Sequence, residues 1–188
     1  VLCRPRVGAL AAAGDNVVIV AEGAMIPEHE ARRVVVHEVD GHLLPRARAR
    51  GLVPALYHLG SAGAADEEEG RAVCLEENAG LLHVGRKRAL AARHLASSMA
   101  EQGASFVDRV QRLLAENFEL PEALLTVERV MRGAHRVGSE VHGGFGRERV
   151  YLPAYLRIRR VGDTRPEMFE ALGQARLSLD ARRKLLGR

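Results

Sequence analysis

The sequence predicts an α+β fold that is mostly helical, with a small β-hairpin or sheet near the N-terminus. Extended apolar stretches flank a turn within the first 26 residues, and from Pro27 onward apolar residues recur mainly at helical spacing. The chain has 188 residues, of which 47% are hydrophobic. That length can bury a substantial core, so we expect one domain that covers residues 1–188. Because the chain does not start with Met, we also expect it to lack an upstream region of a longer protein.

The predicted β element is a hairpin. Residues 6–12 and 16–26 flank the sequence Ala-Gly-Asp-Asn, which is typical of a tight turn. Pro27 suits the first turn of a helix, and acidic residues follow it closely. The three valines at 34–36 would equally suit a strand. The acidic start, and Pro45 just after the apparent end, favour a helix.

The rest of the chain is predicted to be a linker followed by helices. Residues 46–64 contain Gly51, Pro54, Gly60 and Gly63 and are expected to form the linker. Two helices are predicted next: one from about Ala64 that buries Ala65, Ala72, Val73 and Leu75, and one that contains Leu90, Ala91, Leu95 and Met99. Ser105 is expected to cap a further helix, and Pro121 to open another that has Leu124, Val127, Val130 and Met131 on one face and Gly133 at its end. The last predicted elements are a loop at 137–146, a segment at 147–160 that Pro153 kinks or restarts, and a short helix that begins with a Thr164–Glu167 capping box and ends near Gly173.

Composition argues against two classes of protein. The net charge is +4, but acidic residues are mixed with the arginines and aromatic residues are only 4%, so we expect no nucleic-acid partner. No apolar run approaches the roughly 20 residues of a membrane span, so we expect no membrane association. The two cysteines are too few for a disulfide framework, which favours a reducing, cytoplasmic setting.

One motif carries metal chemistry. His37, Glu38 and His42 form His-Glu-x-x-x-His, in which two imidazoles can bind Zn²⁺ and a carboxylate can act as a base. The usual spacing of zinc-protease histidines is four residues. A spacing of five separates them by about 140° on a regular α-helix. A π-bulge would bring both histidines onto one face, and Gly41 would tolerate the distortion. The alternative interpretation is that His37 and His42 are ordinary surface or core histidines that bind no metal.

A third ligand can come from the acidic run at Asp66–Glu69, which begins an otherwise apolar helix. Such a run can also be an ordinary solvated first turn. Glu69 differs from its neighbours because the small residues Gly70 and Ala72 follow it, which would let this helix approach the histidine helix closely.

At these motifs the sequence resembles a known family, the HExxxH tyrosine carboxypeptidases. Its members include the microtubule-associated tyrosine carboxypeptidase and bacterial relatives named for a Gln-Glu-Gly-Leu-Ala motif. The family's His-Glu-Val-Gly-Thr-His is similar to residues 37–42, and its Gln-Glu-Gly-Leu-Ala to residues 68–72. Residues 103–110, 127–135, 146–152 and 175–180 also resemble family segments. Asp40, Gly41, Glu68, Arg71 and Met131 replace common family residues.

The resemblance implies a zincin-like metallopeptidase domain that holds zinc through His37, His42 and Glu69, with Glu38 as the general base. It implies a carboxypeptidase that removes an aromatic or acidic residue from the C-terminal tail of a polypeptide. Arg132 and Arg147 are candidates to bind the substrate carboxylate, because they stand at basic positions of the family's later motifs. Tyr151, or a nearby arginine, is a candidate to stabilise the oxyanion.

Two alternatives stay open at the level of sequence. A catalytically inactive zinc-binding module for protein interaction would keep the fold and the metal without turnover. An arginine-mediated nucleic-acid binder would show affinity that falls steeply with salt and does not respond to chelators.

Overall fold

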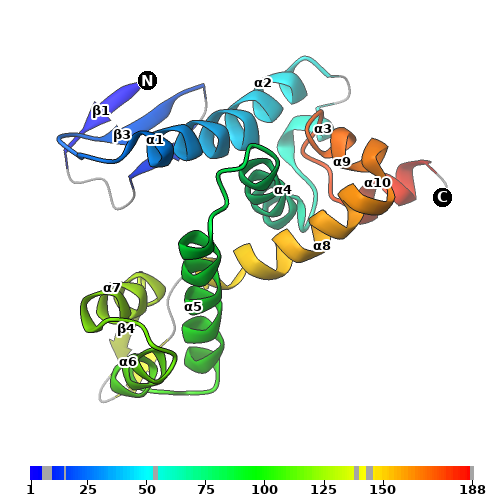
Figure 1. Ribbon diagram of the computed structural model, residues 1–188. Helices are drawn as coiled ribbons and strands as arrows, with labels where there is room; N and C mark the ends of the chain where they lie inside the picture. Colours follow the sequence, from blue (N-terminus) through cyan, green and yellow to red (C-terminus); the bar gives the residue numbers. More distant parts are fainter. Residues whose placement is uncertain (6–9, 15, 53–54, 138–139, 143–145, 187–188) are drawn as a thin grey trace. The chain divides into compact units, whose positions relative to one another are not determined.

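The computed structural model describes residues 1–5, 10–14, 16–52, 55–137, 140–142 and 146–186 (Figure 1). It is mostly helical, with one three-stranded and one two-stranded sheet, and this confirms the predicted α+β class. The chain divides into two compact units, Val1–His83 with Ala154–Arg188, and Val84–Pro153. The single domain over 1–188 stays a prediction. No described helix has both the length and the apolar character needed to cross a membrane.

The first unit combines the three-stranded sheet with a long interrupted helix and several shorter ones. In chain order its elements are β1 (Leu2–Arg4), β2 (Ala11–Ala13), β3 (Val18–Ala21), α1 (Glu28–Val35), the π-helix η1 (Val36–Leu43), α2 (Leu44–Arg50), α3 (Leu56–Leu59), α4 (Ala64–Asn78), α8 (Tyr151–Thr164, which begins three residues before this unit resumes), α9 (Pro166–Leu172) and α10 (Leu179–Leu186).

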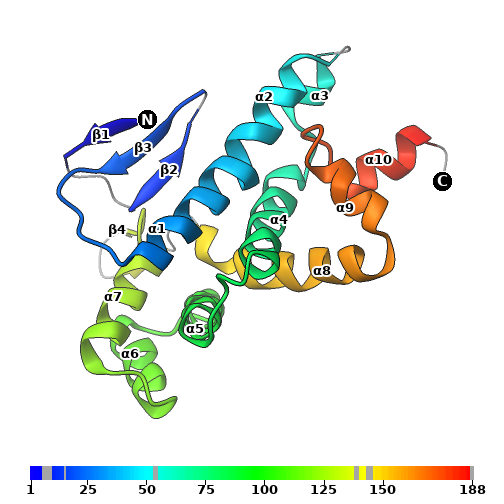
Figure 2. The ribbon, with the colours of Figure 1, turned by 45° about the horizontal axis from the view of Figure 1, so that its top comes forward.

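The sheet contains the predicted hairpin and one additional strand. β2 and β3 are antiparallel, with Ala13 opposite Val18, and the Gly14 N–H donates to the Val17 carbonyl over 2.8 Å. Of the predicted turn, Asp15 lies outside the described residues. β1 pairs in parallel with the other side of β3, so the strand order is β1-β3-β2 and β2 is an edge strand (Figure 2). β1 has only three residues, which is too short to show the alternation of apolar and polar residues by which a strand is recognised in a sequence.

The helix that starts after Pro27 is longer than predicted. α1, η1 and α2 run into one another without a break (Figure 1), so the predicted end before Pro45 is wrong. The π-helix explains how Pro45 is accommodated. The Leu44 N–H bonds back five residues to the Val39 carbonyl. The next bond in that pattern would run from residue 45 to the Asp40 carbonyl, but proline has no N–H. The Arg71 guanidinium donates to that carbonyl instead, over 3.1 Å.

α4 begins at Ala64, as the sequence predicts, but its buried face is partly different. Ala72 and Val73 are fully buried, Leu75 is half-buried and Ala65 is exposed. The preceding region is not only a linker, since it contains the end of α2 and the short α3; Pro54 lies outside the described residues.

The C-terminal elements of the first unit follow the proline positions. Pro153 lies in the first turn of α8, as a restart of the helix requires. The predicted capping box is wrong: the Thr164 hydroxyl donates to the Arg160 carbonyl, and Arg165 occupies the cap position of α9 without a side-chain bond. Thr164 still belongs to α8, and Pro166 sets the start of α9 later than the pattern indicated. Gly173 follows the end of α9, as predicted.

The second unit is a group of helices around its own core. Its elements are α5 (Val84–Glu101), α6 (Phe106–Ala115), α7 (Leu120–Val130), β4 (His135–Val137), β5 (Glu140–His142) and the short helix η2 (Arg147–Arg149). The predicted cap of α6 is confirmed, because Ser105 and Asp108 each accept a bond from the other's backbone N–H. The buried core residues are Ala92, Ala96, Val110, Leu113, Ala123, Val127 and Val130.

Two expectations for the second unit need correction. Leu124 is exposed, because the inward position of α7 is taken by Ala123. The expected loop at 137–146 instead contains parts of β4 and β5, which form an antiparallel pair. Residues 138–139 and 143–145 lie outside the described residues.

Candidate metal centre

The His-Glu-x-x-x-His motif lies entirely within the π-helix. η1 spans Val36–Leu43, so the distortion that the five-residue spacing predicts is present. Because π-helical hydrogen bonds join residues five apart, His37 and His42 lie on the same side of the helix. Their ring centroids are 5.0 Å apart and the rings meet edge to face.

Both imidazoles point their Nε2 atoms at one carboxylate oxygen. The distance from Glu69 Oε2 to Nε2 is 3.4 Å for His37 and 3.4 Å for His42. One ligand atom from each of the three residues lies within 4.8 Å of the others, and all three side chains are buried. The structure therefore brings together the three residues for which the sequence predicts metal binding.

Close packing between η1 and α4 brings Glu69 to the histidines. A Cβ atom built on Gly41 would lie 2.5 Å from the Ala72 Cβ, so only glycine allows the two helices to approach this closely. The sequence assigned Gly41 a role in helix distortion, whereas its backbone is not in a glycine-specific region and its role is this contact. Gly70 serves α4 in the same way on another side, where it packs against Ala154 of α8.

Two further carboxylates hold the outer nitrogens of the histidines. His37 Nδ1 lies 2.7 Å from Glu76 Oε1, and His42 Nδ1 lies 2.7 Å from Glu68 Oε1. A carboxylate at Nδ1 fixes the ring orientation and makes the opposite nitrogen a better metal ligand. Sequence reasoning missed both roles. Glu76 follows Glu69 by seven residues, which is two helical turns, and this spacing was the available signal.

Arginines support these outer carboxylates in turn. Arg33 of α1 donates to Glu76 Oε1 over 3.2 Å, and this is how the fully buried Glu76 is compensated. Arg46 of α2 donates to Glu68 Oε1 from two of its nitrogens, at 3.0 and 2.6 Å. Both arginines lie in the same interrupted helix as the histidines, so one long helix supplies two ligands and the arginines that bind the outer carboxylates.

The charges of the site are strongly coupled. Burial by itself lowers the pKa of His42, but its bonds to Glu68 and Glu69 outweigh burial and raise the pKa to about 9. The pKa of His37 is raised in the same way by Glu69 and Glu76. Burial opposes ionisation of Glu69, yet both histidines hold the pKa of that carboxyl well below its usual range. A metal ion binds neutral imidazoles, so the affinity of this centre for a cation would depend on pH.

The set of donor atoms fits zinc. Two imidazole nitrogens and one carboxylate oxygen are ligands that Zn²⁺ prefers, and catalytic zinc sites keep three protein ligands and one open position. Calcium and magnesium favour oxygen ligands throughout. The carboxylate partners at both Nδ1 atoms are a further property of histidine metal sites. The described geometry can thus hold a metal ion through His37, His42 and Glu69.

Glu38 is turned toward the edge strand and does not belong to the ligand set. Its Oε2 accepts the backbone N–H of Ala13 in β2 over 2.7 Å. The backbone carbonyl of Ala13 accepts a hydrogen bond from the Arg46 guanidinium over 3.0 Å. The end of β2 is therefore fixed to the histidine helix through both polar groups of one residue, and the carboxylate of Glu38 has a defined direction.

The three predicted substrate residues all lie in the second unit. Arg132 and Arg147 are exposed and Tyr151 is buried. Beside Arg147, Glu148 is buried and forms ion pairs with Arg129 at 2.7 Å and Arg93 at 3.6 Å, which joins η2 to α7 and α5. Substrate roles for Arg132, Arg147 and Tyr151 stay predictions.

Comparison with known proteins identifies one family. The family model described as "Microtubule-associated tyrosine carboxypeptidase" matches residues 1–179, which include the whole π-helix and α4. The chain matched no curated protein and no solved structure.

Proposed function

The chain belongs to the microtubule-associated tyrosine carboxypeptidase family, and on that premise we propose that it is a zinc-dependent carboxypeptidase with a zincin-like fold. Its substrate is the C-terminal tail of a polypeptide, from which it removes an aromatic or acidic residue. His37, His42 and Glu69 hold the zinc, and Glu38 is the catalytic base.

The convergence of three buried ligand atoms carries the proposal. Both Nε2 atoms face Glu69 Oε2, while both Nδ1 atoms face carboxylates of α4. The two Nε2 atoms converge on a single buried carboxylate oxygen, so one cation placed between them could bind all three groups. Here both nitrogens of both rings are directed at carboxylates, and this arrangement prepares the Nε2 atoms for a cation.

The chemistry follows from the residues around the metal position. When bound, zinc supplies a Lewis acid that polarises the scissile carbonyl and acidifies water. Glu38 takes a proton from the attacking water and delivers it to the leaving amine. The Ala13 N–H holds one oxygen of Glu38, so the direction of the carboxylate is set before substrate binds.

Residues of the second unit are proposed to recognise the substrate. Arg132 and Arg147 carry the charge and the planar fork that suit a terminal carboxylate. The Tyr151 hydroxyl can donate to the developing oxyanion. Cys3 and Cys74 are both free, one exposed and one buried, which is compatible with the proposed cytoplasmic setting.

The test uses zinc-loaded protein and peptides that differ only in their last residue, with mass spectrometry to detect the loss of one C-terminal amino acid. We expect release by the unaltered protein and a loss of about 10²-fold or more in Glu38→Gln, as for removal of a general base. Glu28→Gln is the matched control, because Glu28 is an exposed glutamate of the same long helix. Bound zinc without release in any variant would instead support the inactive binding module, and failure to bind zinc would contradict the metal centre.

A further inference from the structure

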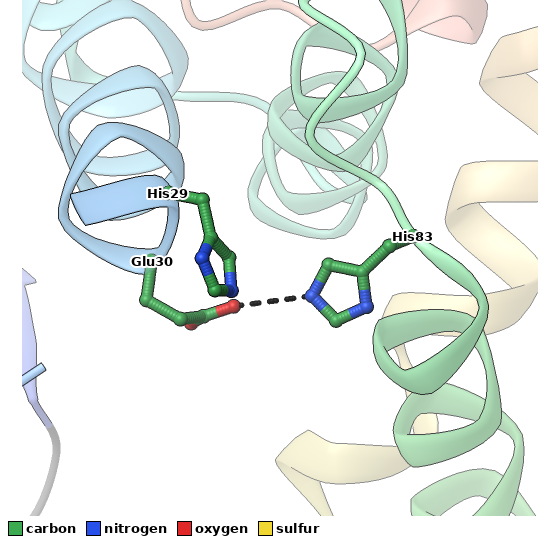
Figure 3. Close-up of side chains that lie close together, drawn as sticks. All are labelled: His29, Glu30 and His83. Atoms are coloured by element: carbon green, nitrogen blue, oxygen red, sulfur yellow. Dashed lines mark hydrogen bonds and ion pairs between the residues drawn. The ribbon is translucent and has the colours of Figure 1, made fainter. Parts of the chain in front are cut away.

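A second cluster of metal-ligating side chains lies on the surface of the first unit. His29, Glu30 and His83 each offer one ligand atom, and these atoms lie within 4.8 Å of one another (Figure 3). His83 Nε2 is 3.3 Å from Glu30 Oε1. The rings of His29 and His83 have centroids 5.7 Å apart and meet edge to face. The cluster shares no residue with the proposed catalytic centre.

The fold holds these residues in place from two directions. His29 and Glu30 are in the first turn of α1, where side chains tilt toward the start of the helix. Figure 3 shows the Glu30 carboxylate directed toward His83, with the His29 ring beside that carboxylate. His83 follows the buried Leu82, and the Leu81 N–H bonds to the Glu76 carbonyl at the end of α4. Segments 53 residues apart in sequence are thus fixed against each other.

The carboxylate of Glu30 is already oriented. Arg33, one turn later in α1, donates to Oε2 over 3.0 Å and so leaves Oε1 as the oxygen that faces the histidine rings. Glu30 is partly buried, whereas about half of the His83 side chain is exposed, 48% by area. A cation between the three residues would therefore have a preset carboxylate on one side and water on the other.

We propose that His29, Glu30 and His83 form a second metal site, which takes a divalent cation of the nitrogen-preferring class, Zn²⁺, Cu²⁺ or Ni²⁺. Two imidazoles and one carboxylate favour these ions over Mg²⁺ and Ca²⁺, which require oxygen ligands. A bound ion joins the first turn of α1 to the connection after α4. It therefore acts as a cross-link within the first unit, and it stabilises the folded state by mass action.

The second site is weaker than the buried one. Its ligands are more exposed, Arg33 places a positive charge beside Glu30, and the start of α1 carries the positive end of the helix dipole. The buried centre has outer carboxylates at both histidines, whereas the surface cluster has one carboxylate, shared with an arginine. The two sites will therefore fill at different free metal concentrations.

The experiment counts ions by native mass spectrometry in zinc buffers of increasing free concentration. The unaltered protein is expected to take up a further zinc ion only at free zinc about tenfold or more above that which fills the buried centre. His83→Ala and His29→Ala should lose this later ion and keep the earlier one. His94→Ala, which removes a histidine of α5, should bind like the unaltered protein, and circular dichroism checks that each variant folds.

A second measurement identifies the ligands directly. Zinc-loaded protein receives one equivalent of Cu²⁺, and electron paramagnetic resonance records the coupling to imidazole nitrogen, which should weaken in His83→Ala. The proposal is overturned if the later ion is absent from the unaltered protein or persists in both histidine variants. Failure of the catalytic proposal would give a different result. The unaltered protein would then lack the ion of the buried centre, or would not cleave peptides, but would still take up the ion that depends on His83.

Discussion

Gly70 provides the sharpest test of how α4 is placed. It follows the proposed ligand Glu69, and its backbone touches the start of α8. A Cβ atom at this position would lie 2.6 Å from the carbonyl carbon and oxygen of Ala154 and 2.9 Å from its Cβ. Carbon atoms in good contact are about 3.5–4.0 Å apart. Gly70→Ala therefore requires the two helices to separate by about 1 Å, and no side-chain rotation can relieve a contact with backbone.

The magnitude follows from two opposing terms. Overpacking a well-packed site costs about 1–3 kcal/mol, and the backbone contacts place Gly70→Ala at the upper end. Replacing glycine by alanine within a helix returns about 0.5–1 kcal/mol. We expect a net loss of about 2 kcal/mol in the free energy of unfolding. Because Glu69 is adjacent, zinc affinity should fall as well.

A matched glycine in α8 isolates the packing term. The Cβ of Gly162→Ala would lie 3.6 Å from the Phe169 ring, which is ordinary contact, so this variant should be unchanged or gain up to about 1 kcal/mol. Urea unfolding measures both variants, and a chromophoric chelator measures zinc affinity by competition. Adding Ala154→Gly to Gly70→Ala should restore little, because the carbonyl group stays in place. Equal stability and zinc affinity of Gly70→Ala and Gly162→Ala would refute the reasoning.

Two other predictions concern buried groups of α4. Glu76→Gln should lower zinc affinity by about 10–100-fold, because an amide cannot replace the carboxylate at the outer nitrogen of His37. The same competition assay should show no such loss for the neighbouring Glu77→Gln. Burial raises the pKa of the Cys74 thiol to about 12. A thiol reagent at pH 8 should therefore label the exposed Cys3 and reach Cys74 only after unfolding. Labelling of both thiols at the same rate in the folded protein would argue against the burial of Cys74.

The sequence was most informative where the chemistry is local. The five-residue spacing of His37 and His42 is compatible with a shared ligand only if the helix is distorted, and the structure has a π-helix over those residues. The Ser105 cap and the β2–β3 hairpin were predictable for the same reason, because each depends on a few consecutive residues. Glu69 was one of four consecutive acidic residues, and the small residues after it, together with the family motif, distinguished it before the structure did.

The features that sequence could not predict depend on contacts between distant segments. Glu76 is charged and lies in a helix, so from sequence it would be placed on a solvated face, yet it is fully buried because His37 and Arg33 of the long helix reach it. The cluster of His29 and His83 likewise joins positions that no spacing rule relates. Pro45 misled in a different way: proline normally ends a helix, but here a distant arginine supplies the missing donor.

Two departures from the family motif act together around the centre. At positions 68 and 71 the bacterial relatives' motif has Gln and Leu, and this chain has Glu and Arg. Glu68 binds the outer nitrogen of His42 and also Arg46. Arg71 is buried and donates to the Asp40 carbonyl, within the π-helix itself. Neither change touches a proposed ligand atom. Both changes instead affect how the histidine helix is held. Glu68, paired with Arg46, fixes the ring of His42. Arg71 donates to the Asp40 carbonyl, to which Pro45 cannot donate. The two changed residues therefore support the proposed ligand set without belonging to it.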